Sequence, residues 1–263
     1  MNTVEKNLMM RGRLVNAPAL EDAKAALDKE HTASNWYDYG MALSKAKRSD
    51  EAVDAYSQGL VEFPFSALLY FGRGRRYMGS SYEQAIADFT MAIQLEGDVN
   101  LYWYYRAVCH NMCGNFEQAI YDFRQALRYA QPEDCYSMYD WIFSSYVEMG
   151  DMESARKLIA EAPDDQDVPD MDWDYKCRVR LYKGLRKPEE MLNLEEIRKH
   201  VPDPDDDLKL DIVTLRYGMF IYYTWIGDVE KGNEQLLAIV NDPFEGAFAT
   251  TKARYYAKAR GLI

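Results

Sequence analysis

The chain has 263 residues, 48% of them hydrophobic, and its 31 Lys and Arg residues against 43 Asp and Glu residues give a formal net charge of −12. This hydrophobic content excludes a disordered chain, and the acidity disfavours nucleic-acid binding, because affinity for phosphate backbones comes mostly from Lys and Arg. The most apolar stretch, residues 217–227, is too short to span a membrane, and charges interrupt residues 1–20. We therefore expect a cytoplasmic protein with neither a nucleic-acid nor a membrane partner.

A recurring sequence motif predicts helices along most of the chain. A small polar or glycine turn is followed by an aromatic or aliphatic residue, Glu, any residue and then Ala or Gly, and the motif returns after about 34 residues. Its small residues include Ala52, Ala85, Ala119 and Ala155. A large residue stands four positions later and another small one three positions after that, so these side chains share one helix face.

The predicted elements follow one another as helical hairpins. Residues 1–32 are expected to form a degenerate N-terminal hairpin, residues 33–244 a repeat array, and residues 245–263 a C-terminal capping helix. Within the array, each first helix carries a large aromatic residue upstream of the small one. These residues are Trp36, Tyr70, Trp103, Tyr139 and Trp173.

The hairpin that starts at Trp36 resembles the tetratricopeptide repeat, whose unit has Trp, Leu-Gly and Tyr on its first helix and Ala, Phe, Ala and Pro on its second. The matching residues are Trp36, Gly40, Ala52, Tyr56, Gly59 and Pro64. The resemblance covers residues 33–244 and implies an all-α, right-handed superhelical solenoid of antiparallel hairpins, with about six to seven repeats and the capping helix. It also implies a non-enzymatic adaptor or scaffold, and the sequence contains no recognisable catalytic motif.

The resemblance further implies a binding site on the concave face, formed by a second stripe along each first helix. In the first three hairpins this stripe is rich in aromatic residues and Met, which suit the binding of a protein or peptide. The predicted groove residues are Tyr37, Met41, Phe71, Arg75, Met78, Tyr104, Val108, Asn111, Asp140, Ser144, Arg178 and Tyr217. Two alternatives stay open: the stripe is core, covered by tight winding or by the terminal helices, or it mates with a second copy in a self-associating structural subunit.

Some members of the family bind C-terminal carboxylates through a clamp of Lys, Asn and Arg. The matching positions here are Tyr37, Met41, Gly72, Leu101 and Tyr105, so this recognition is not expected. Arg73, Arg75 and Arg76 form a small basic cluster, for which a phosphate site is the less favoured interpretation.

Metal and cofactor sites are not expected. Cys109, His110 and Cys113 have a spacing that could place ligands on one helix, but their positions in the repeat favour packing. The acidic runs 161–174 and 203–207 lack the spacing of a calcium loop, and we interpret them as solvated loops.

Overall fold

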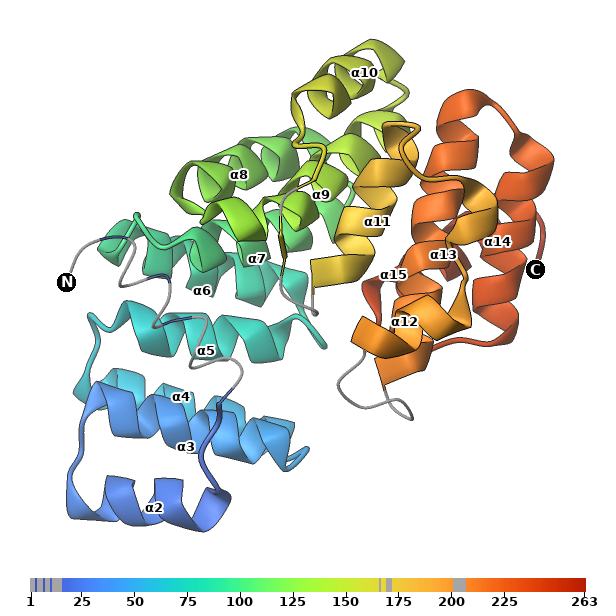
Figure 1. Cartoon of the computed structure of the whole chain (residues 1–263). Coiled ribbons are helices and arrows are strands. Elements are labelled where there is room, and N and C mark those ends of the chain that lie inside the picture. Colours follow the sequence, from blue (N-terminus) through green and yellow to red (C-terminus); the bar gives the residue numbers. More distant parts are fainter. Residues whose placement is uncertain are drawn as a thin grey trace. The chain divides into compact units, whose positions relative to one another are not determined.

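The computed structural model describes residues 3, 7, 10, 16–165, 167–168, 172–200 and 207–263. The chain folds into two compact units, Met1–Ala130 and Gln131–Ile263. Within the described ranges every regular element is a helix, as the repeat pattern predicted (Figure 1). In that part of the chain, no helix combines the length and the hydropathy needed to cross a membrane.

The first unit is a succession of helix pairs. Each pair consists of two neighbouring helices joined by a short turn, and the second helix of one pair packs against the first helix of the next. The helices are α2 (Leu20–Lys29), α3 (Ala33–Lys45), α4 (Ser49–Glu62), α5 (Ala67–Tyr77), α6 (Tyr82–Leu95), α7 (Asn100–Met112) and α8 (Phe116–Tyr129). The pairs are α3 with α4, α5 with α6 and α7 with α8, and α2 packs on α3.

The second unit continues the pattern less regularly. Its elements are η1 (Pro132–Asp134), α9 (Cys135–Met149), α10 (Met152–Glu161), α11 (Trp173–Tyr182), η3 (Pro188–Glu190), α12 (Leu194–His200), α13 (Asp207–Ile226), α14 (Val229–Asn241) and α15 (Phe248–Ala259). The helices α9 and α10 form one pair and α13 and α14 another, while α11 packs on both α9 and α13. Helix α15 packs on α14 and α13, where a capping helix was expected.

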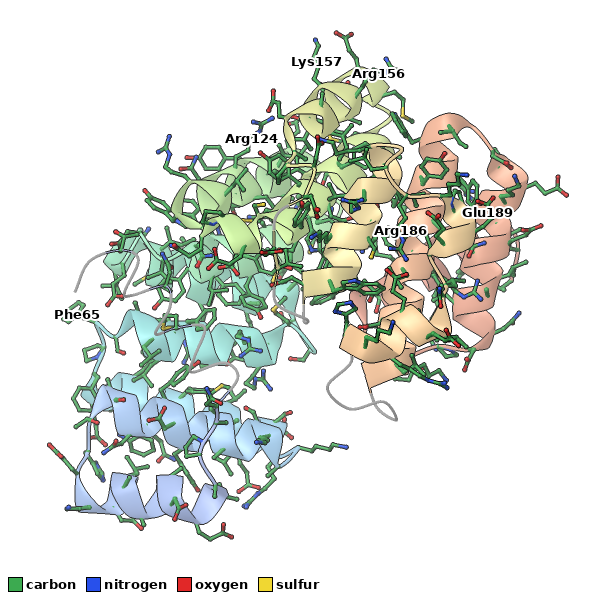
Figure 2. All side chains as sticks on the ribbon, viewed as in Figure 1. Phe65, Arg124, Arg156, Lys157, Arg186 and Glu189 are labelled. Carbon is green, nitrogen blue, oxygen red and sulfur yellow. The ribbon has the colours of Figure 1, made fainter. Side chains whose placement is uncertain are left out.

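The hairpin that begins at Trp173 departs from the regular repeat pattern. Lys187 and Pro188 introduce the short η3 turn, and the helix that follows, α12, has only 7 residues. Arg186, labelled in Figure 2, still joins the two helices, because its Nη2 lies 2.6 Å from a carboxylate oxygen of Glu196 and its guanidinium lies 5.6 Å from the Trp173 ring.

The small residues of the repeat allow the close packing of helices that their spacing predicted. A Cβ added at Gly40 or at Gly72 would lie 2.5 Å from the ring of Tyr56, which is itself fully buried. The aromatic side chain of one second helix therefore fills the space that glycine leaves on two successive first helices. Tight turns complete the pairs, since Gly114 and Gly150 adopt positive φ angles of 77° and 79° after α7 and α9.

A repeated ion pair also connects the helices of the first unit. Arg73 on α5 donates two hydrogen bonds of 2.8 Å to the carboxylate of Asp88 on α6. One hairpin later, Arg106 on α7 makes the same two bonds to Asp122 on α8, at 2.7 and 2.8 Å. Bidentate pairs of this kind are geometrically specific, so Arg73 serves hairpin packing.

Candidate functional site

In the first unit, the predicted groove residues come from α3, α5 and α7 and the residue that follows α5, and we call the side of these helices that carries them the inner face. Tyr37, Phe71 and Val108 are completely buried, and Met41 and Asn111 retain 8% and 1% of their exposed surface. The remaining three predicted residues are partly buried: Arg75, Met78 and Tyr104. In the free chain these residues are therefore not an open aromatic trough, although Tyr37, Met41 and Phe71 do come together in one cluster.

The guanidinium group of Arg75 packs against aromatic rings at this cluster. This group is 5.1 Å from the centre of the Tyr105 ring and 5.9 Å from that of Phe71, and its Nη1 is 3.9 Å from the Met41 sulfur. Contacts with ring faces stabilise a cation that burial has removed from water. Tyr104 points elsewhere, with its ring 5.7 Å from Phe123 of α8.

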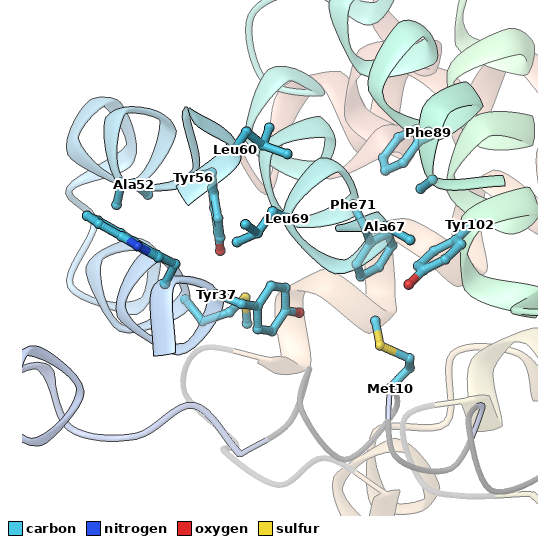
Figure 3. Close-up of a cluster of buried hydrophobic side chains, with 14 of the residues drawn as sticks. Met10, Tyr37, Ala52, Tyr56, Leu60, Ala67, Leu69, Phe71, Phe89 and Tyr102 are labelled. Atoms are coloured by element: carbon cyan, nitrogen blue, oxygen red, sulfur yellow. The ribbon is translucent and has the colours of Figure 1, made fainter. Parts of the chain in front are cut away.

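Met10, near the start of the chain, lies against the inner face of the first unit. Met10 is only 2% exposed and belongs to the same buried cluster as Tyr37, Phe71 and Tyr102 (Figure 3). Burial of a Met side chain of this kind contributes about 1.5–3 kcal/mol. The chain thus places one of its own apolar side chains against the rings that the repeat pattern assigned to partner binding.

Asn7 is attached at the ends of α7 and α8. Its Nδ2 donates to the carbonyl oxygens of Asp98 at 3.3 Å and Tyr129 at 3.1 Å, and its Oδ1 accepts the backbone N–H of Asn100 at 2.9 Å. The Asn100 N–H starts a helix and the Tyr129 carbonyl ends one, so neither has an intrahelical partner. Thr3 adds a bond from its Oγ1 to Asp98 Oδ2 at 3.0 Å.

In the second unit, the predicted groove residues form a buried polar cluster. Arg178 Nη2 lies 2.9 Å from Asp140 Oδ2, and Tyr182 donates a 2.9 Å hydrogen bond to Asp140 Oδ1. Burial raises the pKa of Asp140 to about 6, although Arg178 and Tyr182 act in the opposite direction. Asp140 and the neighbouring Ser144 have no exposed surface, so both belong to the core of the unit.

Tyr217 belongs to a second charged group in the same unit. Its hydroxyl donates to Glu148 Oε1 at 2.5 Å, while Lys252 Nζ lies 2.6 Å from Glu148 Oε2. Both Lys252 and Glu148 are almost completely buried. A buried carboxylate and ammonium are stable in this setting only as a pair.

A cavity of about 330 Å³ opens between these groups. Two predicted groove residues, Arg178 of α11 and Tyr217 of α13, line it together with Asp174 and Thr214 of the same helices. Trp141 of α9 and Lys252 of α15 complete its wall. The phase of the repeat therefore identified one side of this cavity, whereas Trp141 and Lys252 lie outside the stripe and gave no signal in the sequence.

The other chemical candidates have structural roles. Cys109 is buried, as its predicted packing role requires, and burial raises the pKa of its thiol to about 12. Cys113 is exposed, so the packing role expected for it was wrong. In the acidic run, Asp164 and Asp165 pair with Lys183 and Lys176 at 2.7 and 2.8 Å. Residues 203–206 lie outside the described ranges. Over the described residues, no group of three or more His, Cys, Asp or Glu side chains is placed to hold a metal ion.

Comparison with known proteins supports the repeat assignment. Residues 70–134 match the tetratricopeptide repeat family. Among solved structures, that of YrrB, described as a TPR protein with an unusual peptide-binding site, has 14% sequence identity and a TM-score of 0.51, with 92% of this chain and 100% of that chain covered. A crystal structure of MamA has 19% identity and a TM-score of 0.49, covering 62% of this chain and 93% of that chain. The likeness to YrrB shows a shared helical-repeat fold, and the comparison with curated protein sequences gives no match.

Proposed function

We propose that the chain, whose residues 70–134 match the tetratricopeptide repeat family, is a non-enzymatic adaptor that binds a helical segment of a partner protein on the inner face of its first unit. The observation that carries this proposal is that the chain's own Met10 is buried in one cluster with Tyr37 and Phe71, while Asn7 binds backbone groups at the ends of α7 and α8. Both residues are helical, and residues three positions apart share one side of a helix. The YrrB structure, whose description names a peptide-binding site, has the same fold and makes a peptide ligand reasonable.

The contacts of Asn7 and Met10 indicate what such a segment must present. An unbranched apolar side chain fits among Tyr37, Phe71 and Tyr102, because Met adapts to irregular spaces. An amide fits at the ends of α7 and α8, because it can both donate to a carbonyl and accept an N–H. We infer that the partner is an amphipathic helix with these two side chains in the same spacing.

A partner has to compete with the chain's own residues. A tethered segment acts at an effective concentration on the order of 1 mM, so its docking lowers the apparent affinity of any second segment. Weakening the internal contact should therefore strengthen binding from outside. Asn7 and Met10 make a suitable pair of substitutions, because neither is part of the repeat hairpins.

The experiment uses the full chain and a fluorescent peptide with the sequence of residues 1–15. We expect the peptide to bind the Asn7→Ala/Met10→Ala variant at least about tenfold more tightly than the wild type, as measured by fluorescence anisotropy. A peptide with the same two substitutions should bind neither protein. Equal binding of both peptides, or no binding of the native one to the variant, would contradict the proposal.

The alternative function, a self-associating subunit, predicts a different result. If Asn7 and Met10 dock on the inner face of a second copy, the wild type should sediment as a dimer and the Asn7→Ala/Met10→Ala variant as a monomer. An adaptor with internal docking should be monomeric in both forms. Sedimentation velocity at micromolar concentration separates the two.

A further inference from the structure

The cavity in the second unit contains a buried acidic side chain that forms no ion pair among the described residues. Asp174, at the start of α11, lines the cavity and is only 7% exposed. Its Oδ1 accepts the N–H of Tyr175 at 2.7 Å, and among the described residues it takes part in no ion pair. A charged group removed from water in this way is costly unless a partner of opposite charge reaches it.

The two bases in the cavity wall are already engaged. Arg178 Nη2 lies 2.9 Å from Asp140, and Lys252 Nζ lies 2.6 Å from Glu148. Each of these basic side chains is thus paired with a carboxylate that does not line the cavity. Asp174, which does line it, is an additional acidic group with no such pair.

A second acidic side chain lies near Asp174. Asp211 of α13 also lines the cavity, and burial, followed by repulsion from Asp211, raises the pKa of Asp174 to about 8. The surroundings therefore disfavour the charged form of Asp174 and would stabilise a cation placed between the two carboxylates.

The rest of the wall suits the apolar part of a ligand. Trp141, Tyr175 and Phe248 line the cavity. The rings of Trp141 and Phe248 meet edge to face, with their centres 6.1 Å apart. Aromatic rings attract cations through their faces and pack against alkyl chains. A volume of about 330 Å³ is at the lower end of ligand pockets, so it suits one side chain or a small molecule.

We propose that this cavity binds the ammonium or guanidinium group at the end of an alkyl chain, with the carboxylate of Asp174 as its counter-ion. The alkyl chain packs on the aromatic wall and the cation lies beside Asp174 and Asp211. The chemistry is that of a Lys or Arg side chain and also that of a free diamine. This site lies within the second unit and does not depend on the peptide surface of the first.

The test measures binding to the full-length protein by saturation-transfer NMR and calorimetry. The probes are butylamine and butylguanidine, with 1-butanol as the neutral analogue. Nα-acetyl-lysinamide represents a basic residue of a protein, and 1,4-diaminobutane represents a free diamine. Tighter binding of Nα-acetyl-lysinamide would identify the ligand as a basic side chain of a protein, and tighter binding of 1,4-diaminobutane would identify it as a free diamine.

Two variants that each remove one negative charge distinguish a direct role of Asp174 in binding from an effect of the protein's overall charge. We expect Asp174→Asn to weaken butylguanidine binding at least about tenfold, whereas Glu234→Gln, which alters an exposed residue of α14, should leave it unchanged. Asp174→Asn should not lower the melting temperature, because the amide resembles the protonated acid. Binding of 1-butanol as tight as that of butylamine, equal binding to the Asp174→Asn variant, or no binding of either cation would overturn the proposal.

The pH dependence gives an independent readout. Butylguanidine stays charged at all relevant pH values, so its affinity should follow the ionisation of Asp174, whose pKa is about 8. The charged groups around Asp174 are Asp211 on α13, Arg178 on α11, Lys252 on α15 and Asp172, which directly precedes α11. Between pH 7 and pH 9 the affinity for the wild type should rise about tenfold, and that for Asp174→Asn should stay constant. A constant affinity for the wild type would contradict the role of Asp174.

Discussion

Replacement of Asp174 by Asn should change how the stability of the protein depends on pH. The folded state raises the pKa of Asp174 from its ordinary 3.8 to about 8, so between these values the folded chain holds a proton that the unfolded chain has lost. Stability then falls as pH rises, by about 1.4 kcal/mol for each pH unit, and levels off above pH 8. From pH 6 to pH 8 the contribution of Asp174 is thus a loss of about 2–3 kcal/mol, which the Asn variant should not show.

The assay is urea unfolding of wild type and variant at pH 6, 7, 8 and 9. The difference in unfolding free energy between Asp174→Asn and the wild type should increase in favour of the variant up to pH 8 and then become constant. Other titrating groups are common to both proteins and cancel in this difference. A difference that stays constant from pH 6 to pH 9 would refute the argument that burial holds Asp174 in its protonated form.

Two further substitutions test the packing of the units. Gly72→Ala should destabilise the first unit by about 1–3 kcal/mol, because the new Cβ would lie 2.5 Å from the Tyr56 ring, and Gly79→Ala, where the nearest atom is 3.8 Å away, should lower the melting temperature little. Arg178→Met should cost about 3–5 kcal/mol in urea unfolding, because it leaves Asp140 buried without a cation and with only the hydrogen bond from Tyr182, and the added change Asp140→Asn should recover part of the loss. Equal effects of the two glycine substitutions, or an unchanged midpoint for Arg178→Met, would contradict these assignments.

The regular part of the fold was predictable because its causes are local and periodic. Ala52, Ala85 and Ala119 recur at nearly constant spacing, and a small residue at that place is what close helix packing requires. The same spacing placed Arg178 and Tyr217 on the predicted stripe, and both line one cavity in the structure.

The accessibility of the inner face could not be predicted in this way. Whether Tyr37 is exposed depends on where residues far away in the sequence, such as Met10, come to lie, and these residues do not take part in the repeat. Asn7 similarly binds the free backbone groups at the ends of two helices, an interaction that no periodic pattern encodes. Lys252 reaches the cavity from α15, outside the phase of the repeat.

The position of Met10 in solution shows whether the chain's own side chain occupies the proposed binding face of the first unit. With carbon-13 in the methyl groups of the 13 Met residues, the Met10 signal can be assigned through a Met10→Leu variant. Our account predicts that the rings of Tyr37, Phe71 and Tyr102 shift this signal upfield in the free chain, and that an excess of the unlabelled 1–15 peptide moves it to the position of an exposed Met. A Met10 signal already at the exposed position, or one that does not move while the peptide binds, would contradict the account.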